Sequence, residues 1–245
     1  MSVGKKIAAE ECVNRHCASG QVIGIGSGST VIPAVERLGQ LYRTGAIENI
    51  RCVPSSFQSR QLIVDNGLPL STLEITPRLA VYIDGADEFD RQLNCIKGGG
   101  GCLTQEKIAM SCADKFYIVA HSIKYANILG TNWTSLPIDV IPQAWKPIQL
   151  RIEAVLGGKA LLRHAKAKAG PLVTDNGNFI IDWTFPGGTF GENGVPRSRE
   201  EMTKLNGALL AMPGVIETGL FVGNAHAAYI GDDTGELRCI VPESN

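Results

Sequence analysis

The chain has 245 residues, a net charge of −1 and 19% charged residues, which is long enough for one large domain or two small ones. This balance argues against a nucleic-acid-binding face, a basic membrane-binding patch and an acidic tail. No apolar run approaches the ~20 residues that span a bilayer, and the opening stretch MSVGKKIAAEEC lacks the apolar core of a signal peptide.

The cysteines indicate a reducing compartment. There are seven, an odd number, and none forms a CxxC pair. Free thiols therefore fit better than a disulfide framework, and we expect a cytoplasmic protein. Cys102 lies in a glycine loop where it could react, but no histidine lies beside it in the sequence to activate it.

The first half of the chain alternates predicted strands and helices. Short apolar runs predict strands at residues 21–26, 50–54, 79–84 and 115–120. The segments between and before them predict helices at residues 5–17, 29–42, 55–67 and 104–113. This alternation predicts an α/β fold with a mostly parallel, Rossmann-like sheet covered by helices on both faces.

The pattern changes near residue 128. Residues 172–183, LVTDNGNFIIDW, predict a hairpin around a polar turn, and residues 144–158 predict a helix. A capped helix at 198–214 leads into final strands at 215–221, 226–231 and 237–241. We predict a main α/β catalytic domain of residues 1–130 and 206–245, with a smaller α+β domain of residues 131–205 inserted into it.

The first candidate site is the loop GIGSGST, residues 24–30. A strand that ends in glycines and opens a helix presents backbone N–H groups and the positive end of the helix dipole to an anion. The residues that would bind it are Ser27, Gly28, Ser29 and Thr30. A dinucleotide site is the alternative, but the spacing is GxGxG and the next strand ends without an acid for a ribose. A purely structural turn is the third interpretation.

The second candidate site follows the strand LAVYID. Asp84 ends this strand, Gly85 and Ala86 form a close turn, and Asp87 follows. Two carboxylates at a strand end can bind sugar hydroxyls or move protons between oxygens. A solvated Asx turn and a divalent metal are the alternatives, although no histidine nearby supports a transition metal. Two further acids are expected at the surface: Glu88 and Asp90.

The third candidate site is KGGGGCLTQEKI, residues 97–108. Its glycines, Gly98, Gly99 and Gly100 among them, can form a nest of N–H groups. Thr104 is the expected N-cap of a helix whose first turn contains Glu106, a candidate base that could equally be an ordinary first-turn acid. Lys97 supplies a cation for an oxyanion. Together the three sites suit proton transfer on a phosphorylated sugar.

These motifs resemble the ribose-5-phosphate isomerase A family. The resemblance covers GIGSGST, DGADEFD, KGGGGCLTQEKI and VTDNGNFIIDW in the family's order, and SSFQSRQLI and PGVIETGLF extend it. It implies interconversion of ribose 5-phosphate and ribulose 5-phosphate in the non-oxidative pentose phosphate pathway, without a metal or an organic cofactor, by a homodimer or homotetramer.

The resemblance also implies roles for individual residues. Glu106 would be the general base, and Asp84, Asp87 and Lys97 would complete the catalytic set. The substrate-binding segments would be residues 27–30, 84–87 and 97–100, joined by Lys124.

The chain departs from the family's pattern at His121, where an aspartate is usual, and at Cys102, where alanine is common. Near the N-terminus, Lys6 is a better candidate than Lys5 to reach the phosphate, although either could be a solvated helix lysine. A non-catalytic phosphosugar sensor, an acyl-group transferase with a glutamate nucleophile and a nicotinamide-dependent oxidoreductase remain as alternatives.

Overall fold

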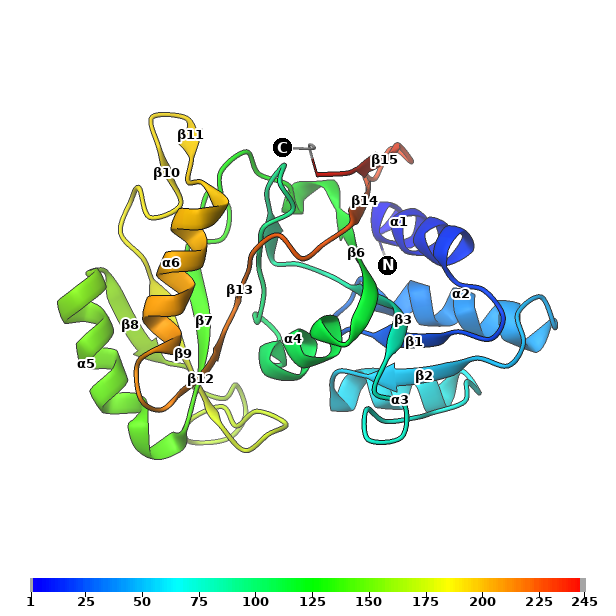
Figure 1. Ribbon diagram of the computed structural model, residues 1–245, viewed down its shortest axis with the longest axis horizontal. Coiled ribbons are helices and arrows are strands. Elements are labelled where there is room, and N and C mark those ends of the chain that lie inside the picture. Colours follow the sequence, from blue (N-terminus) through cyan, green and yellow to red (C-terminus); the bar gives the residue numbers. More distant parts are fainter. Residues whose placement is uncertain (1, 243–245) are drawn as a thin grey trace.

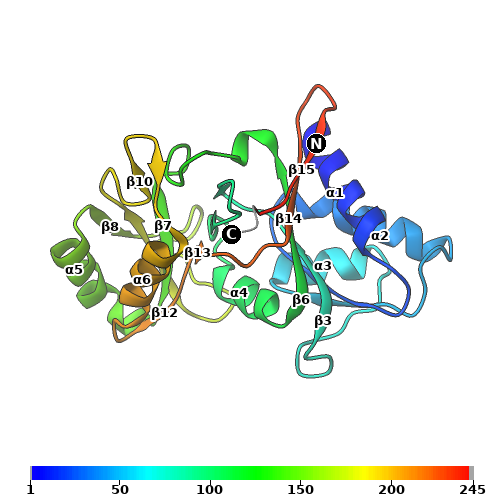
Figure 2. The same ribbon diagram turned by 45° about the horizontal axis from the view of Figure 1, so that its top comes forward.

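The computed structural model describes residues 2–242. The chain forms two lobes, with a six-stranded sheet and helices α1, α2 and α3 in one and a four-stranded sheet with α5 and α6 in the other (Figure 1). The lobes meet at α4, which contacts β3 and β6 of the large sheet and β7 and β12 of the small sheet (Figure 2).

The large sheet confirms the predicted α/β fold. Its strands run in the order β15-β14-β6-β3-β1-β2, and all neighbours are parallel except β14 and β15. The strand bounds are Val22–Ile25 for β1, Arg51–Pro54 for β2, Leu79–Asp84 for β3, Ala113–His121 for β6, Ala227–Gly231 for β14 and Leu237–Ile240 for β15.

Helices cover both faces of this sheet because successive side chains of a strand point to opposite sides. In β6, Tyr117 and Val119 pack against α1 and α2, whereas Phe116 and Ile118 pack in the core that α4 covers. The helices concerned are α1 (Val3–His16), α2 (Val31–Arg43), α3 (Phe57–Asp65) and α4 (Leu103–Ser111). Apolar residues on both faces explain why these strands are nearly continuous apolar runs in the sequence.

The small sheet is antiparallel, with the order β12-β7-β9-β8. Its elements are β7 (Ser135–Val140), α5 (Trp145–Leu156), β8 (Lys159–Leu162), β9 (Phe179–Thr184), α6 (Arg199–Leu210) and β12 (Val215–Thr218). A separate hairpin joins β10 (Gly191–Glu192) to β11 (Val195–Pro196). Short 3-10 helices lie at Ser122–Lys124 (η1) and Pro142–Ala144 (η2).

Two sequence predictions in this region were wrong in detail. The hairpin predicted within residues 172–183 contributes only β9, which pairs with β8 and β7, whereas residues 172–178 form a loop whose turn is closed by the Thr174 N–H donating to the Asn178 carbonyl. The predicted strand at residues 215–221 is two strands of different sheets, since Gly219 separates β12 from β13 (Leu220–Phe221). β13 pairs with β5 (Cys95–Ile96), which pairs with β4 (Glu88–Phe89).

The boundaries predicted for the inserted domain, residues 131–205, stay a prediction. Helix α6 and strand β12, residues 199–218, both accompany the small sheet. The chain returns to the large sheet only at β14, after β13 has crossed between the lobes (Figure 1).

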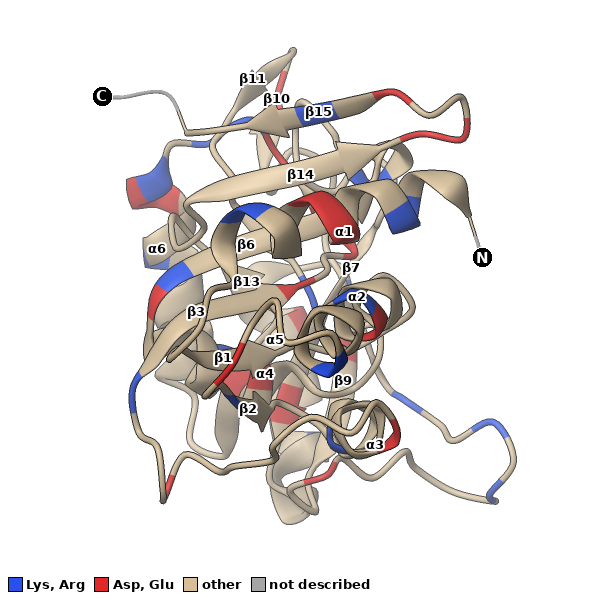
Figure 3. Ribbon diagram, turned by 90° about the vertical axis from the view of Figure 1, so that its right-hand side faces the viewer, with Lys and Arg blue, Asp and Glu red and all other residues tan. Residues whose placement is uncertain are grey.

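Charge is mixed on the surface of the large lobe. On the face shown in Figure 3, helices α1, α2 and α3 each carry residues of both signs. Within residues 2–242, no helix is both long enough and apolar enough to cross a membrane.

Candidate active site

The order of the large sheet creates a crevice between β1 and β3. The chain leaves β1 toward the β2 edge, whereas it leaves β3 toward β6 on the other side. Ligands bind at such a switch point, outside the carboxyl ends of the strands. Residues 26–30 follow β1 and residues 84–87 follow β3, so two of the three predicted sites meet there.

The third site completes a cavity of about 250 Å³ at this crevice. Its lining includes every predicted site residue except Asp84, together with Lys5 of α1. The lining residues are Lys5, Ser27, Gly28, Ser29, Thr30, Gly85, Ala86, Asp87, Lys97, Gly98, Gly99, Gly100, Glu106 and Lys124.

Glu106 and Lys97 form a buried ion pair inside the cavity. The Nζ of Lys97 lies 3.1 Å from Oε2 of Glu106 and 2.8 Å from Oδ2 of Asp84, and it donates to the Gly85 carbonyl at 2.6 Å. The contact with Glu106 is close enough for an ion pair but lacks hydrogen-bond geometry, and Oε2 of Glu106 has no hydrogen-bond partner. The Glu106 carboxylate therefore lines the cavity with an ion pair but no hydrogen bond to Oε2, which suits it to exchange a proton with a ligand.

The surroundings of Glu106 raise its pKa, so that its carboxyl group is protonated up to a higher pH than an exposed glutamate. Burial, reinforced by the charge of Asp84, raises the pKa of Glu106 to about 7 against the opposing effect of Lys97. Burial disfavours the charged form of Lys97, but Asp84 and Glu106 outweigh it and hold the pKa of Lys97 above its ordinary value. A base with a pKa near neutrality is suited to take and return a proton.

The two aspartates of the second site differ in access. Asp84 is fully buried, and its oxygens accept hydrogen bonds from the Tyr82 hydroxyl and from the N–H groups of Ser27 and Gly85. Asp87 lines the cavity, and burial raises its pKa although the Gly99 N–H donates to its Oδ2 at 2.7 Å. Asp84 thus anchors Lys97, whereas Asp87 can reach a ligand.

The backbone conformation and the close neighbours of Gly98 and Gly99 explain why these two positions carry no side chain. Gly98 has a φ of +97°, and a Cβ there would lie 2.6 Å from a methyl group of Leu103. A Cβ on Gly99 would lie 2.6 Å from Asp87, so a side chain would separate this carboxylate from the Gly99 N–H. Arg163 of the small lobe donates to the carbonyl groups of Gly98 and Gly99.

A lysine of α1 contacts the predicted anion-binding loop, residues 27–30. Lys5 Nζ donates to the Ser29 hydroxyl at 2.8 Å, beside the start of α2, whose N-cap is Thr30. The expectation that Lys6 is the better candidate was wrong: Lys6 is exposed and lies 3.9 Å from Glu10 on its own helix. On the far side of the cavity, Lys124 Nζ lies 5.3 Å from the ring centroid of Trp133.

Three further expectations need correction. The N-cap of α4 is Cys102, whereas Thr104 is helical and donates to Asp139 at 2.5 Å. Glu88 and Asp90 are buried rather than at the surface, because backbone N–H groups bind their carboxylates. No sequence signal distinguished Glu88 and Asp90 from solvated acids, because most of the groups that donate hydrogen bonds to them are backbone N–H groups of turns, which any residue type supplies.

The cysteine at the loop is a poor nucleophile in this setting. Burial, reinforced by the charge of Glu106, raises the pKa of the Cys102 thiol to about 12. All seven cysteines are unpaired. In the described part of the chain, no group of at least three His, Cys, Asp or Glu side chains is arranged to hold a metal ion.

A larger hollow of about 400 Å³ lies on the other side of α4. Its lysine, Lys107, is bound by Glu217 and by the carbonyl groups of Thr218 and Leu220. The smaller cavity is the better candidate for an active site because it is lined by Glu106, whose pKa lies near neutrality.

Comparison with known proteins identifies relatives over nearly the whole chain. The family model described as ribose 5-phosphate isomerase A (phosphoriboisomerase A) matches residues 51–235. A probable ribose 5-phosphate isomerase of Caenorhabditis elegans is 44% identical over 237 residues, 97% of this chain and 91% of that protein. The ribose-5-phosphate isomerase of Homo sapiens is 44% identical over 235 residues, which cover 96% of this chain and 72% of that protein.

A solved structure of a D-ribose-5-phosphate isomerase in complex with phospho-erythronic acid superposes with a TM-score of 0.87. The two chains are 36% identical, and the match covers 97% of each. The likeness therefore includes both lobes and the crevice.

Proposed function

Because the chain belongs to the ribose 5-phosphate isomerase A family and is an aldose–ketose isomerase acting on ribose 5-phosphate and ribulose 5-phosphate, we propose that Glu106 is its general base. The observation that carries this proposal is the buried carboxylate of Glu106, which lines the cavity beside Lys97 and has no hydrogen bond to its Oε2. Its raised pKa lets it hold the proton between the two half-reactions.

The isomerisation follows from one base beside two adjacent carbons. After the furanose opens, Glu106 takes the C2 proton of the aldose, and the electrons form an enediolate. The proton of the C2 hydroxyl passes to the C1 oxygen, Glu106 returns its own proton to C1, and the C2 oxygen becomes the carbonyl of the ketose. A single carboxylate can serve both carbons because they are neighbours.

Asp87 is the better supported acid for ring opening. It lines the cavity and its pKa is raised, mainly by burial, so it can exchange a proton with the ring oxygen. Asp84 does not line the cavity, and its contacts support a different role as the anchor of Lys97.

The charge that develops on the enediolate oxygens would be stabilised by Lys97 and the glycine N–H groups. Lys97 was expected to bind the oxyanion directly, but its ammonium already contacts Asp84, Glu106 and the Gly85 carbonyl. Its proposed contribution is therefore a fixed positive charge beside the reacting carbons, while the N–H groups of the loop bind the oxygen itself.

The phosphate would bind at residues 27–30. The hydroxyl groups of Ser27, Ser29 and Thr30, the start of α2 and the ammonium of Lys5 support this assignment. Lys124 lines the same cavity. The related structure that holds phospho-erythronic acid, a phosphorylated acid, supports a site for a phosphorylated chain.

We further propose a cytoplasmic homodimer or homotetramer. The seven unpaired cysteines support a reducing compartment. Sedimentation of the purified protein measures the oligomeric state directly, and a monomer at working concentration would contradict this part of the proposal.

The test of the base is Glu106→Gln, which keeps the shape and removes the basic oxygen. We expect kcat for ribose 5-phosphate to fall at least ~100-fold, the lower end of general-base catalysis. Glu200→Gln is the matched control, because Glu200 also lies in a first helical turn but is exposed and paired with Lys204. Near wild-type turnover in Glu106→Gln would remove Glu106 from the mechanism.

A further inference from the structure

The glycine loop of the active site is held by one arginine of the other lobe. Arg163 follows β8, and its Nη1 donates to the carbonyl oxygens of Gly98 at 2.9 Å and Gly99 at 3.1 Å. Its Nε and Nη2 donate to the two carboxylate oxygens of Asp182, on β9, at 2.8 and 2.5 Å. This bidentate pair fixes the plane of the guanidinium, which a lysine could not do.

Holding two carbonyl groups also orients the N–H groups that follow them. All peptide bonds among the described residues are trans, and in a planar trans peptide the C=O and N–H point in opposite directions. The Gly98 carbonyl points to Arg163, so the Gly99 N–H points away and donates to Asp87. The Gly99 carbonyl also points to Arg163, so the Gly100 N–H faces away from it too.

We propose that Arg163 is a positioning residue for the isomerisation. By binding the outer side of the loop, it turns the N–H groups of Gly99 and Gly100 toward Asp87 and the substrate oxygens. The loop needs this support because consecutive glycines lose more conformational freedom on ordering than other residues do. The inference rests on the proposed function, in which these N–H groups stabilise the enediolate and Asp87 moves a proton.

The same contacts link Arg163 to the titration of Asp87. Burial is the main cause of the raised pKa of Asp87, and it is opposed by the Gly99 N–H and then by the charges of Lys97, Lys124 and Arg163. Loss of Arg163 would remove its charge and loosen the Gly99 contact. Both changes favour the protonated form of Asp87, so they would move an activity limb that depends on this carboxylate to higher pH.

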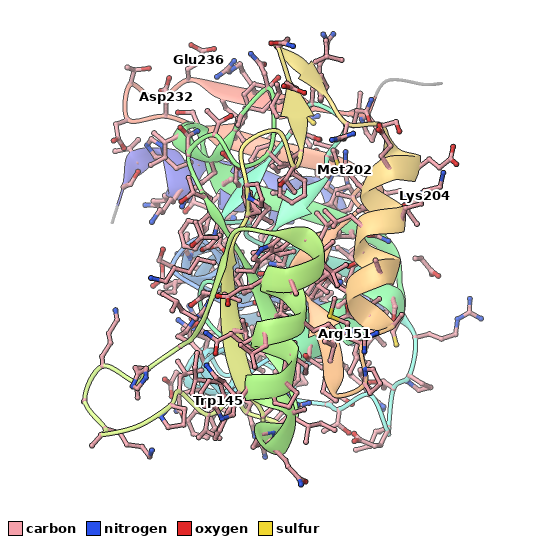
Figure 4. The ribbon with its side chains drawn as sticks, turned by 90° about the vertical axis from the view of Figure 1, so that its left-hand side faces the viewer. Trp145, Arg151, Met202, Lys204, Asp232 and Glu236 are labelled. Carbon is pink, nitrogen blue, oxygen red and sulfur yellow. The ribbon has the colours of Figure 1, made fainter. Side chains whose placement is uncertain are left out.

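The experiment compares Arg163→Met, Arg163→Lys and Asp182→Asn with Arg151→Met. Arg151 is an exposed residue of α5 in the same lobe (Figure 4), so its variant controls for loss of an arginine. Steady-state kinetics across pH are measured for each folded variant, with thermal unfolding as the check on folding.

We expect Arg163→Met to lower kcat at least ~10-fold, since a misplacement of about 1 Å in an active site can cost ~100-fold. The limb of the kcat/KM profile that is set by Asp87, distinct from the limb near pH 7 that Glu106 sets, should move to higher pH. Arg163→Lys keeps the positive charge but loses the bidentate geometry of the guanidinium. Its loss of kcat should therefore be similar to that of Arg163→Met, whereas its pH limb should move less. Asp182→Asn should show a smaller loss of kcat, and Arg151→Met should match the wild type.

Wild-type kcat in Arg163→Lys and Asp182→Asn would overturn the inference, even if Arg163→Met does not fold. A loss of kcat with an unmoved pH limb in every variant would also overturn it, because it would mean a merely structural role. Glu106→Gln separates the two proposals: if that variant retains turnover, the base assignment fails whatever the arginine variants show.

Discussion

The carboxylate of Glu106 and the ammonium of Lys97 lie 3.1 Å apart in the interior of the active site. Both side chains are almost fully buried, at 6% and 4% exposure. Their charges stabilise each other, but Asp84 also contacts Lys97, so the positive charge is shared between two carboxylates. This sharing leaves Glu106 only partly compensated and able to gain a proton near neutral pH.

The first prediction concerns the pH dependence of catalysis. As the proposed base, Glu106 must be deprotonated to take the C2 proton, and its pKa is raised to about 7, first by burial and then by Asp84. We expect kcat/KM to fall about tenfold per pH unit below this pKa and to level off above it. A pH–rate profile checks this, and a limb near pH 4.5, the ordinary value of a glutamate, would contradict it.

The second prediction concerns stability. Because the folded pKa of Glu106 lies above its ordinary value of 4.5, the neutral form is favoured by folding. The stability it contributes is complete below pH 4.5 and is lost as the pH rises through about 7, a loss on the order of 3 kcal/mol. Glu106→Gln stays neutral, so it should unfold at a higher temperature than the wild type at pH 8.

At pH 4 the same comparison should show little difference, since both side chains are then neutral. Thermal unfolding at the two pH values measures the effect, with Glu200→Gln as control. A Glu106→Gln variant that is less stable than the wild type at pH 8 would contradict this prediction. It would mean that the ion pair of Glu106 with Lys97 stabilises the fold by more than burial of the Glu106 charge destabilises it.

The third prediction separates two neighbouring lysines of α1. Lys5 donates to Ser29 in the proposed phosphate-binding loop of residues 27–30, whereas Lys6 is exposed near Glu10. We expect Lys5→Met to raise KM roughly 10- to 100-fold, the worth of a charge-assisted hydrogen bond. Lys6→Met should leave KM unchanged. Equal effects of the two substitutions would show that only the overall charge of the helix matters.

The fourth prediction concerns the glycine loop. Gly98 has a positive φ and no room for a Cβ, so Gly98→Ala should destabilise the fold by at least about 1–2 kcal/mol. Gly100 has no atom within 4 Å of an added Cβ, so Gly100→Ala should keep the wild-type stability. Urea unfolding of the two variants tests this difference, and equal losses would contradict the backbone argument.

The sequence alone indicated the large sheet and most of the active site. Apolar runs closed by glycines or acids marked the carboxyl ends of β1 and β3, and parallel strands bring such ends to one edge. The residues of those loops could therefore be placed together before any coordinates. The position of Glu106 in a first helical turn fits an ordinary helix acid, and its predicted role as a base came from the three loops taken together and from the family resemblance.

The tertiary structure decided which charged groups reach the cavity. Lys5 lies 24 residues from Ser29, and Arg163 lies 65 residues from Gly98, so no local periodicity connects either pair. Likewise, Asp84 and Asp87 look equivalent in the sequence, yet only Asp87 lines the cavity. Hydrophobic periodicity records which face of an element is buried, whereas contacts between polar residues depend on how the helices pack on the sheet and how the two lobes pack around α4.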